Sequence, residues 1–163
     1  MTTDLPKNER LCDPAASVGC VTGFRLGDAL ISMVTAENLR RSGRQVTVYS
    51  RPIHGLARWF PKLAIETIPP EAERRERLSH HDLLVHTFET DVLPESSDHP
   101  GLLVLNRLDA YRRPLKSQVE VHRDLARTLF NVADADIDNG MRHPSELEAS
   151  DPRRVMIHPT ATR

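Results

Sequence analysis

A short turn between two apolar segments holds the residues of this chain that are best placed to do chemistry. Residues 23–28 read Gly-Phe-Arg-Leu-Gly-Asp, after a β-branched run at 17–22 and before an apolar stretch that continues to Arg41. This order predicts a buried strand, a glycine-bearing turn and the first turn of a helix. The first amides of such a helix are unpaired and its dipole is positive there, which suits an anion. Asp28 is either a functional acid or a first-turn acid that stabilises the helix by about 0.3–1 kcal/mol.

Polar and cationic side chains follow the other predicted strands as well. They are Arg25 after the first strand, Arg51 and His54 after the second, His86 and Thr87 after the fourth, and Asn106 and Arg107 after the fifth. Ligands of parallel sheets bind beyond the carboxyl ends of the strands. These residues are therefore predicted to form a cationic, hydrogen-bonding rim over Asp28, suited to an anionic or hydroxyl-rich ligand. Arg112 and Arg113 extend the cationic cluster and favour an anion site, with a solvated surface as the alternative.

The segments that must position these residues alternate between strands and helices. Further strands are predicted at 45–50, 63–68, 82–87 and 102–106, and helices at 27–42, 54–60, 71–78 and 117–132. This alternation predicts an α/β fold, a Rossmann-like parallel sheet with helices on both faces. Residues 1–16 are predicted to be a flexible leader, 17–132 the α/β domain and 133–152 a linker. One more strand is predicted to begin at 154.

Composition excludes several classes of partner. The chain has 163 residues and a net charge of -1, so no overall electrostatic attraction to nucleic acid is expected. No apolar run approaches the roughly 20 residues of a membrane span, and no signal peptide opens the chain. Cys12 and Cys20 form no metal-ligand pattern. A cytoplasmic protein without a metal is the expectation.

Two short motifs resemble a known family. Leu26-Gly27-Asp28 at the start of an apolar helix resembles the N-terminal signature of glycosyltransferase family 9, which contains the ADP-heptose:lipopolysaccharide heptosyltransferases. The closing residues 157–163, Ile-His-Pro-Thr-Ala-Thr-Arg, are similar to the first strand and phosphate loop of that family's second domain. The resemblance implies one half of a GT-B architecture: an acceptor-side domain at 17–132, and at 153–163 the start of a truncated donor domain.

The resemblance also implies roles for particular residues. Asp28 matches the aspartate that serves as general base for the acceptor hydroxyl, and Thr160 and Thr162 match the loop that contacts the donor diphosphate. The substrates would be a nucleotide sugar, with ADP-heptose as one candidate, and a glycolipid or saccharide acceptor, with no separate cofactor. A lipid-linked acceptor would add peripheral contact with the inner membrane.

The sequence departs from the family pattern at two places. The loop before Leu-Gly-Asp reads Thr-Gly-Phe-Arg at 22–25, where the family usually has a Ser-Ser-type loop. The sequence also stops at Arg163, before the lysine that usually follows the Thr-rich loop. The resemblance therefore implies that a C-terminal donor domain, or a second chain, must complete the enzyme, and that these 163 residues are inactive alone.

Two alternatives remain open from the sequence. Ser50-Arg51 resembles the position at which NADP-dependent dehydrogenases place an arginine for the 2′-phosphate, although Gly19, Gly23 and Gly27 lack the G-x-G-x-x-G spacing. The other alternative is a non-catalytic α/β module that binds a partner or a sugar phosphate.

Overall fold

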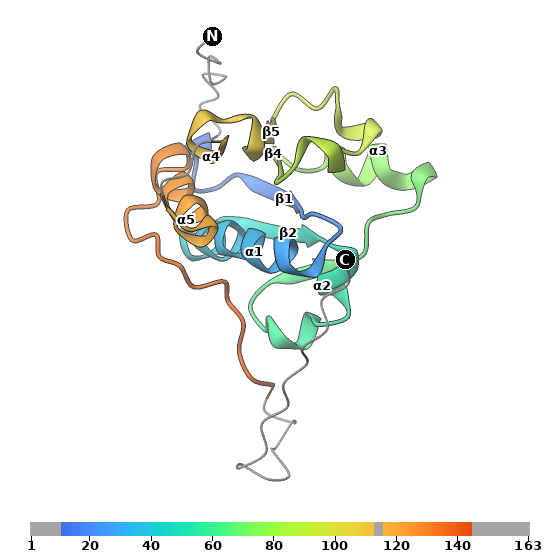
Figure 1. Cartoon of the computed structure of the whole chain (residues 1–163). Helices are drawn as coiled ribbons and strands as arrows, with labels where there is room; N and C mark the ends of the chain where they lie inside the picture. Colours follow the sequence, from blue (N-terminus) through green and yellow to red (C-terminus); the bar gives the residue numbers. More distant parts are fainter. Residues whose placement is uncertain (1–10, 113–115, 145–163) are drawn as a thin grey trace.

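The centre of the structure is a five-stranded, all-parallel sheet (Figure 1). The computed structural model describes residues 11–112 and 116–144. The strands are β1 (Ser17–Val21), β2 (Gln45–Tyr49), β3 (Ala64–Glu66), β4 (Leu83–His86) and β5 (Leu102–Val104). They lie in the order β3-β2-β1-β4-β5, and each neighbouring pair is parallel. The predicted parallel α/β sheet is confirmed.

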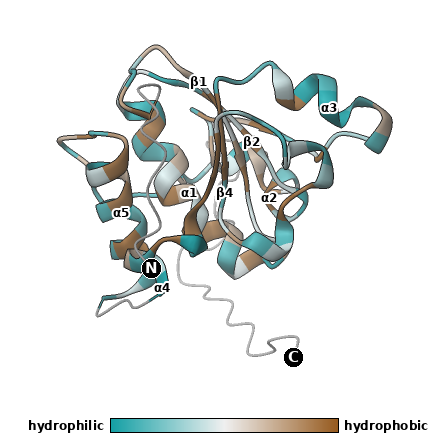
Figure 2. Ribbon diagram, turned by 90° about the horizontal axis from the view of Figure 1, so that it is seen from above, coloured by the Kyte–Doolittle hydropathy of each residue, from teal (hydrophilic) through white to brown (hydrophobic). Residues whose placement is uncertain are grey.

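Helices cover both faces of this sheet. The helices are α1 (Leu26–Arg41), α2 (Arg51–His54), α3 (Glu71–Ser79), α4 (Asp109–Arg112) and α5 (Gln118–Leu129). The two long helices, α1 and α5, pack against each other on one face, and α3 lies on the other (Figure 2). The fold is Rossmann-like, as predicted.

Local signals explain where the long helices begin and end. Arg40 and Arg41 occupy the last turn of α1, and Gly43 follows with a φ of 97°, a left-handed conformation that favours glycine. At the start of α5, Ser117 and Glu120 form a reciprocal capping box. Both helices therefore lie within a few residues of their predicted bounds.

The short helix after β2 differs from its prediction at 54–60. Helix α2 begins at Arg51 because Ser50 caps it, its Oγ accepting a hydrogen bond from the Ile53 amide at 3.2 Å, and because Pro52 fits a first helical turn. A separate 3₁₀ turn, Ala57–Trp59, follows.

The core lies mainly between the sheet and the pair α1 and α5. Val18 and Val48 from the strands, Met33 from α1 and Leu125 from α5 are all almost fully buried there. A smaller cluster, formed by Val21, Tyr49, Leu78, Leu84 and Leu93, fills the space under α3. The two central strands, β1 and β4, are buried on both faces, as is usual for a parallel sheet between helices.

The described domain extends beyond its predicted limits at both ends. Leu11 and Ala16, expected in a flexible leader, are buried in the core. Asp136, expected in a linker, exchanges two hydrogen bonds with Asn38 of α1: its carbonyl accepts from Nδ2 at 2.8 Å and its amide donates to Oδ1 at 2.9 Å. Ala135 beside it is buried. Residues 133–144 are therefore part of the domain, and 145–163 lie outside the described residues.

The strand order creates a switch point between β1 and β4. From β1 the chain moves outward to β2 and β3, and it then returns to β4 on the opposite side of β1. In sheets of this kind, the crevice at the carboxyl ends of the two central strands is the usual place for a ligand.

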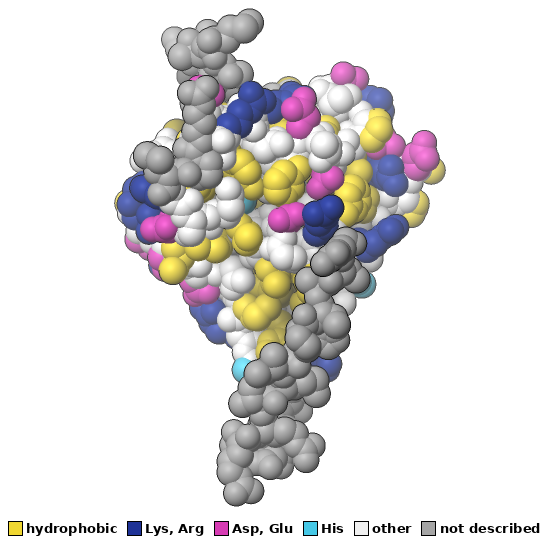
Figure 3. Space-filling model, in the orientation of Figure 1, with side chains coloured by type: hydrophobic (Ala, Val, Ile, Leu, Met, Phe, Trp, Pro, Cys, Tyr) yellow, Lys and Arg dark blue, Asp and Glu magenta, His cyan; other side chains and the backbone are white. Residues whose placement is uncertain are grey.

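Two further observations concern the surface. Among the described residues, none of the helices has the length and hydrophobicity to span a membrane. In the view of Figure 3, Lys and Arg side chains lie interspersed with Asp and Glu, so this face carries no broad charge of one sign.

Candidate functional site

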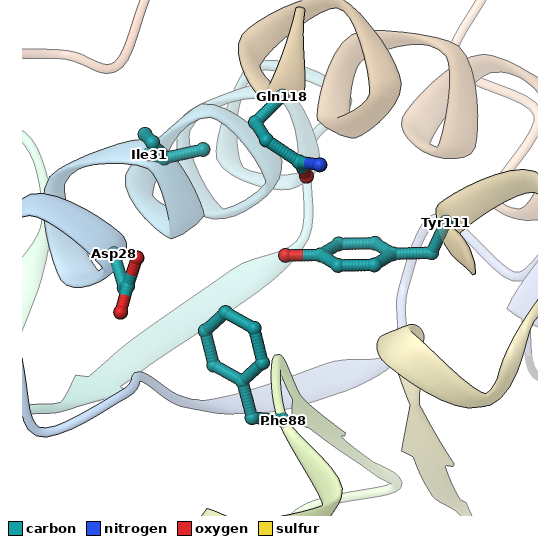
Figure 4. Close-up of a pocket in the computed structure, with 5 residues that line it drawn as sticks. All are labelled: Asp28, Ile31, Phe88, Tyr111 and Gln118. Atoms are coloured by element: carbon teal, nitrogen blue, oxygen red, sulfur yellow. The ribbon is translucent and has the colours of Figure 1, made fainter. Parts of the chain in front are cut away.

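A cavity of about 230 Å³ lies at the carboxyl end of the sheet, next to the switch point. Asp28 and Ile31 line it from the start of α1, after β1, and Phe88 lines it from the loop after β4 (Figure 4). Tyr111 and Gln118 complete it from α4 and the first residue of α5. The fold therefore brings together residues up to 90 positions apart, counted from Asp28 to Gln118.

Asp28 is the acidic member of this lining. It lies in the first turn of α1, where the helix dipole favours a negative charge, and its side chain is partly exposed. Its carboxylate accepts no hydrogen bond from any described residue; only its backbone carbonyl is used, by Ser32 Oγ at 2.8 Å. The carboxylate is therefore available to a ligand in the cavity.

Tyr111 faces Asp28 from the opposite wall. Its hydroxyl points toward α1, between Asp28 and Gln118 (Figure 4). Its ring is held edge-to-face by Phe88, with centroids 6.0 Å apart, and by His122, at 5.5 Å. Burial, together with the charge of Asp28, raises the pKa of Tyr111 to about 12. At neutral pH this side chain is an uncharged phenol, able to donate a hydrogen bond into the cavity.

Contacts made by Thr87 and by Gly23 hold Phe88 in place on its side of the cavity. Thr87 Oγ1 and Ser32 Oγ, both buried, lie 2.7 Å apart and connect the end of β4 to α1. A Cβ on Gly23 would lie 3.2 Å from the Phe88 ring and 3.1 Å from Asp91 Oδ2. Gly23 is therefore a packing glycine that lets the β1 loop approach this wall.

Gly27 differs from Gly23. A Cβ built there would meet nothing within 4 Å, and its φ is not in the left-handed region. Neither packing nor backbone conformation requires glycine in this first turn of α1, one residue before Asp28. The bare backbone leaves open space beside the acid.

Gln118 provides the remaining polar group. Its Oε1 is shielded from solvent and has no hydrogen-bond partner among the described residues. A buried acceptor without a partner is costly, because its hydration has been lost without replacement. Asp28, Tyr111 and Gln118 are thus three polar groups that meet around one cavity.

Most of the predicted rim lies outside this cavity. Arg25, Arg51 and His54 are exposed, and none of them lines it. Arg107 Nη2 donates to Glu89 Oε1 at 2.8 Å, with both side chains half exposed. Arg112 Nε donates to the Asn106 carbonyl at 3.1 Å, and Asn106 Oδ1 accepts from the Glu89 amide at 2.9 Å. Arg113, Thr160 and Thr162 lie outside the described residues.

The assignment of His86 to the rim is wrong. His86 has 0% exposure, because it ends a central strand that is covered on both faces, and its Nε2 lies 3.2 Å from Ser96 Oγ. Burial lowers its pKa to about 4. The side chain is a neutral core group that ties the β4–β5 connection to the sheet, and a ligand on the rim cannot reach it.

Four lining residues were not predicted from the sequence. Ile31 could have been found, because it lies one helical turn after Asp28 on the same face of α1. Phe88, Tyr111 and Gln118 carry no such signal, since only tertiary packing brings them to Asp28. Among the described residues, no group of three or more His, Cys, Asp or Glu side chains is arranged to hold a metal ion.

Comparisons with known proteins add no identity to this geometry. No family model, no curated protein and no solved structure matched the chain significantly.

Proposed function

We propose that this domain binds the acceptor of a glycosyl transfer reaction and that Asp28 is the general base. The observation that carries the proposal is the Asp28 carboxylate, which lines a cavity at the switch point and accepts no hydrogen bond from the described residues. The Leu-Gly-Asp resemblance at 26–28 supports it from the sequence.

The residue types around the cavity suit a sugar hydroxyl. In the proposed step the acceptor oxygen attacks the anomeric carbon of the donor, Asp28 takes the hydroxyl proton, and the nucleoside diphosphate leaves with the electrons of the broken glycosyl bond. A positioned base of this kind contributes about 10²–10⁴-fold in rate. Tyr111 is the neutral donor that would orient the acceptor, and Phe88 provides an apolar wall for the ring.

The size of the cavity fits this partial role. Sites for whole small-molecule ligands typically have volumes of about 300–1,000 Å³. A cavity of about 230 Å³ is suited to one sugar-sized group, with the rest of the acceptor extending over the exposed rim. In this proposal the donor is bound elsewhere, by Thr160 and Thr162 together with a donor domain or a second chain.

The proposal is tested by ligand-binding NMR on the isotope-labelled 163-residue chain. Glucose and methyl heptosides, added as acceptor probes, should shift the signals of Asp28, Tyr111 and Gln118. An Asp28→Ala variant should keep the spectrum of a folded domain and lose the cavity shifts. If saccharides at tens of millimolar leave these signals unmoved, the cavity is not an acceptor site.

A second candidate, an NADP-binding domain, is favoured by one observation. Arg51 is exposed immediately after β2, next to the crevice end of a sheet whose order is that of dinucleotide-binding domains. Against it, Phe88 and Asp91 occupy the space beside Gly23, whereas a pyrophosphate would need an open backbone there. NADP⁺ in the same NMR titration separates the two, because it should shift Arg51 and the α1 N-terminus only if this candidate is right.

A further inference from the structure

The cavity at Asp28 has an electrostatic character that the cationic rim does not share. The five described residues that line it comprise one carboxylate, a phenol, an amide, one aromatic ring and one aliphatic side chain, and none of these described residues is Lys, Arg or His. The nearby Arg107 and Arg112 are engaged elsewhere, with Glu89 and with the Asn106 carbonyl.

The two helix N-termini at the cavity do not reverse this character. Each carries roughly half a positive charge. However, α1 has Asp28 in its first turn and α5 has Glu120, whose carboxylate accepts from the Ser117 amide at 3.0 Å and hydroxyl at 2.7 Å. The full negative charge of Asp28 exceeds the half charge at its own helix end, and the carboxylate of Glu120 occupies the N-terminus of α5.

The polar atoms of the lining also have a consistent preference. The Asp28 carboxylate can only accept hydrogen bonds, and Gln118 Oε1 is a buried acceptor that has no described partner. Phenol oxygen is both donor and acceptor. A ligand group that brings hydrogen-bond donors can pair with all three, whereas a carboxylate or phosphate would meet the like charge of Asp28 and leave Gln118 Oε1 without a donor.

We infer that the cavity selects a hydrogen-bond donor without negative charge, and that Gln118 is the residue that sets this specificity. This inference rests on the proposed acceptor site and names the chemistry that the site takes: a hydroxyl or an ammonium group. Anionic groups of the same ligand remain outside the cavity, where exposed arginines such as Arg25 lie.

Gln118 is the lining residue at which the specificity can be tested most directly, because a charge can be introduced there with little cost to the stability of the fold. It is the first residue of α5 and is only partly buried. Replacement by Met keeps its length and removes the amide, and replacement by Lys places a cation against the cavity. The α5 capping box at Ser117 and Glu120 is left intact in both variants.

The test uses three probes that share one ring: glucose, glucosamine and glucuronate. Each is titrated into the labelled 163-residue chain at pH 7 and low salt, with the shifts of Tyr111 and Gln118 as readout. We expect glucosamine and glucose to bind at least about 10-fold more tightly than glucuronate, the scale of one lost charged contact. The relative shifts of glucosamine and glucose then distinguish ammonium from hydroxyl recognition.

The variants decide the role of Gln118. Gln118→Met should lower the glucose affinity several-fold and keep glucuronate weak, and Gln118→Lys should invert the order of glucose and glucuronate. Equal affinities for glucose and glucuronate at the cavity would overturn this inference and leave the acceptor site standing. No cavity shift with any of the three probes would overturn both. An order unchanged in Gln118→Lys would remove Gln118 as the specificity residue.

Discussion

Asp28 and Tyr111 face each other across one cavity, and the charge of the first adds to burial in raising the pKa of the second to about 12. They come from helices on the two sides of the switch point, α1 after β1 and α4 after β5. The pairing places a charged acceptor opposite a neutral donor, an arrangement suited to holding a hydroxyl between them.

The electrostatic link predicts a spectroscopic effect of Asp28→Asn. Removing the negative charge should lower the pKa of Tyr111, because the phenolate is no longer destabilised by a neighbouring anion. The chain has two tyrosines, so a UV titration of tyrosinate resolves both. Tyr49, whose raised pKa comes from burial and from Glu66, is the internal control and should not move. Identical titrations in both proteins would show that the two groups are not coupled.

The same substitution is also expected to affect turnover. In a chain completed with a donor domain, Asp28→Asn should reduce kcat by about 10²–10⁴-fold with little change in donor affinity, because a general base acts on the acceptor proton. Steady-state kinetics of sugar transfer measure it. Near-normal turnover would exclude Asp28 as the base.

Gly27→Ala separates folding from binding. Alanine in this first helical turn meets no atom within 4 Å, so the free energy of unfolding should stay unchanged or rise by up to about 1 kcal/mol. If a ligand approaches the bare backbone beside Asp28, the added methyl should weaken its binding. Urea denaturation and the NMR titration measure the two quantities. Gly101→Ala is the contrasting control: it should destabilise the fold, since its Cβ would overlap the Asp82 carbonyl oxygen.

The architecture could be predicted from the sequence because its signals are local. Hydrophobic period and β-branched runs identify strands and helices without tertiary information. Asp28 was found in the same way, as an acid after a strand and a turn. The β3–β2–β1–β4–β5 order then brings the β1 and β4 loops together.

The composition of the cavity could not be predicted, for physical reasons that His86 and Tyr111 illustrate. A polar residue at a strand end lies on the rim only if the following connection leaves it uncovered, and the segment carrying Ser96 folds back over His86. Tyr111 reaches Asp28 because its ring is held between Phe88 and His122. Contacts between residues so far apart in the chain produce no periodic pattern in the sequence from which they could be predicted.

The isolated chain is expected not to bind nucleotide sugars measurably. Thr160 and Thr162 are the residues of this chain assigned to the donor diphosphate, and two hydroxyl contacts alone do not offset the loss of translational and rotational freedom on binding, which costs about 4–15 kcal/mol. Calorimetry of the 163-residue chain with ADP and several nucleotide sugars measures this. Micromolar affinity would contradict the proposed division of roles and favour a dinucleotide-type site at 23–28.

The final prediction concerns acid stability and rests on two buried histidines. His86 and His122 both have 0% exposure, and burial lowers the pKa of each to about 4. Nδ1 of His122 lies 2.7 Å from Thr35 Oγ1, and its Nε2 has no partner among the described residues. Neither ring has a described carboxylate hydrogen-bonded to it that would favour the charged form.

The direction of the pH effect follows from proton uptake. An unfolded histidine has a pKa of about 6.5, so between that pH and about 4 the unfolded chain binds protons that the folded chain refuses. The contribution of these two histidines to the free energy of unfolding is complete above pH 6.5. As the pH falls below 6.5, each histidine reduces that free energy by roughly 1.4 kcal/mol per pH unit. Together the two histidines reduce the free energy of unfolding by about 3 kcal/mol per pH unit. The total free energy of unfolding of a typical domain is about 5–15 kcal/mol. Asp124 and Asp138, whose pKa values are lowered to about 2 by Arg123 and Arg142, act only in a lower window, below about pH 4.

Urea denaturation at pH 7.5, 6.0, 5.5 and 5.0 measures this slope. His122→Gln and His86→Gln should each lower stability at pH 7.5, because they disturb packed sites, and should each reduce the slope between pH 6.0 and 5.0, since one titrating group is removed. His81, whose pKa is also lowered by burial, accounts for a smaller part that remains. His54→Gln, at an exposed position, is the matched control and should leave the slope unchanged. A slope that is undiminished in the double variant would mean that other groups take up the protons on unfolding, and would end the assignment of acid sensitivity to His86 and His122.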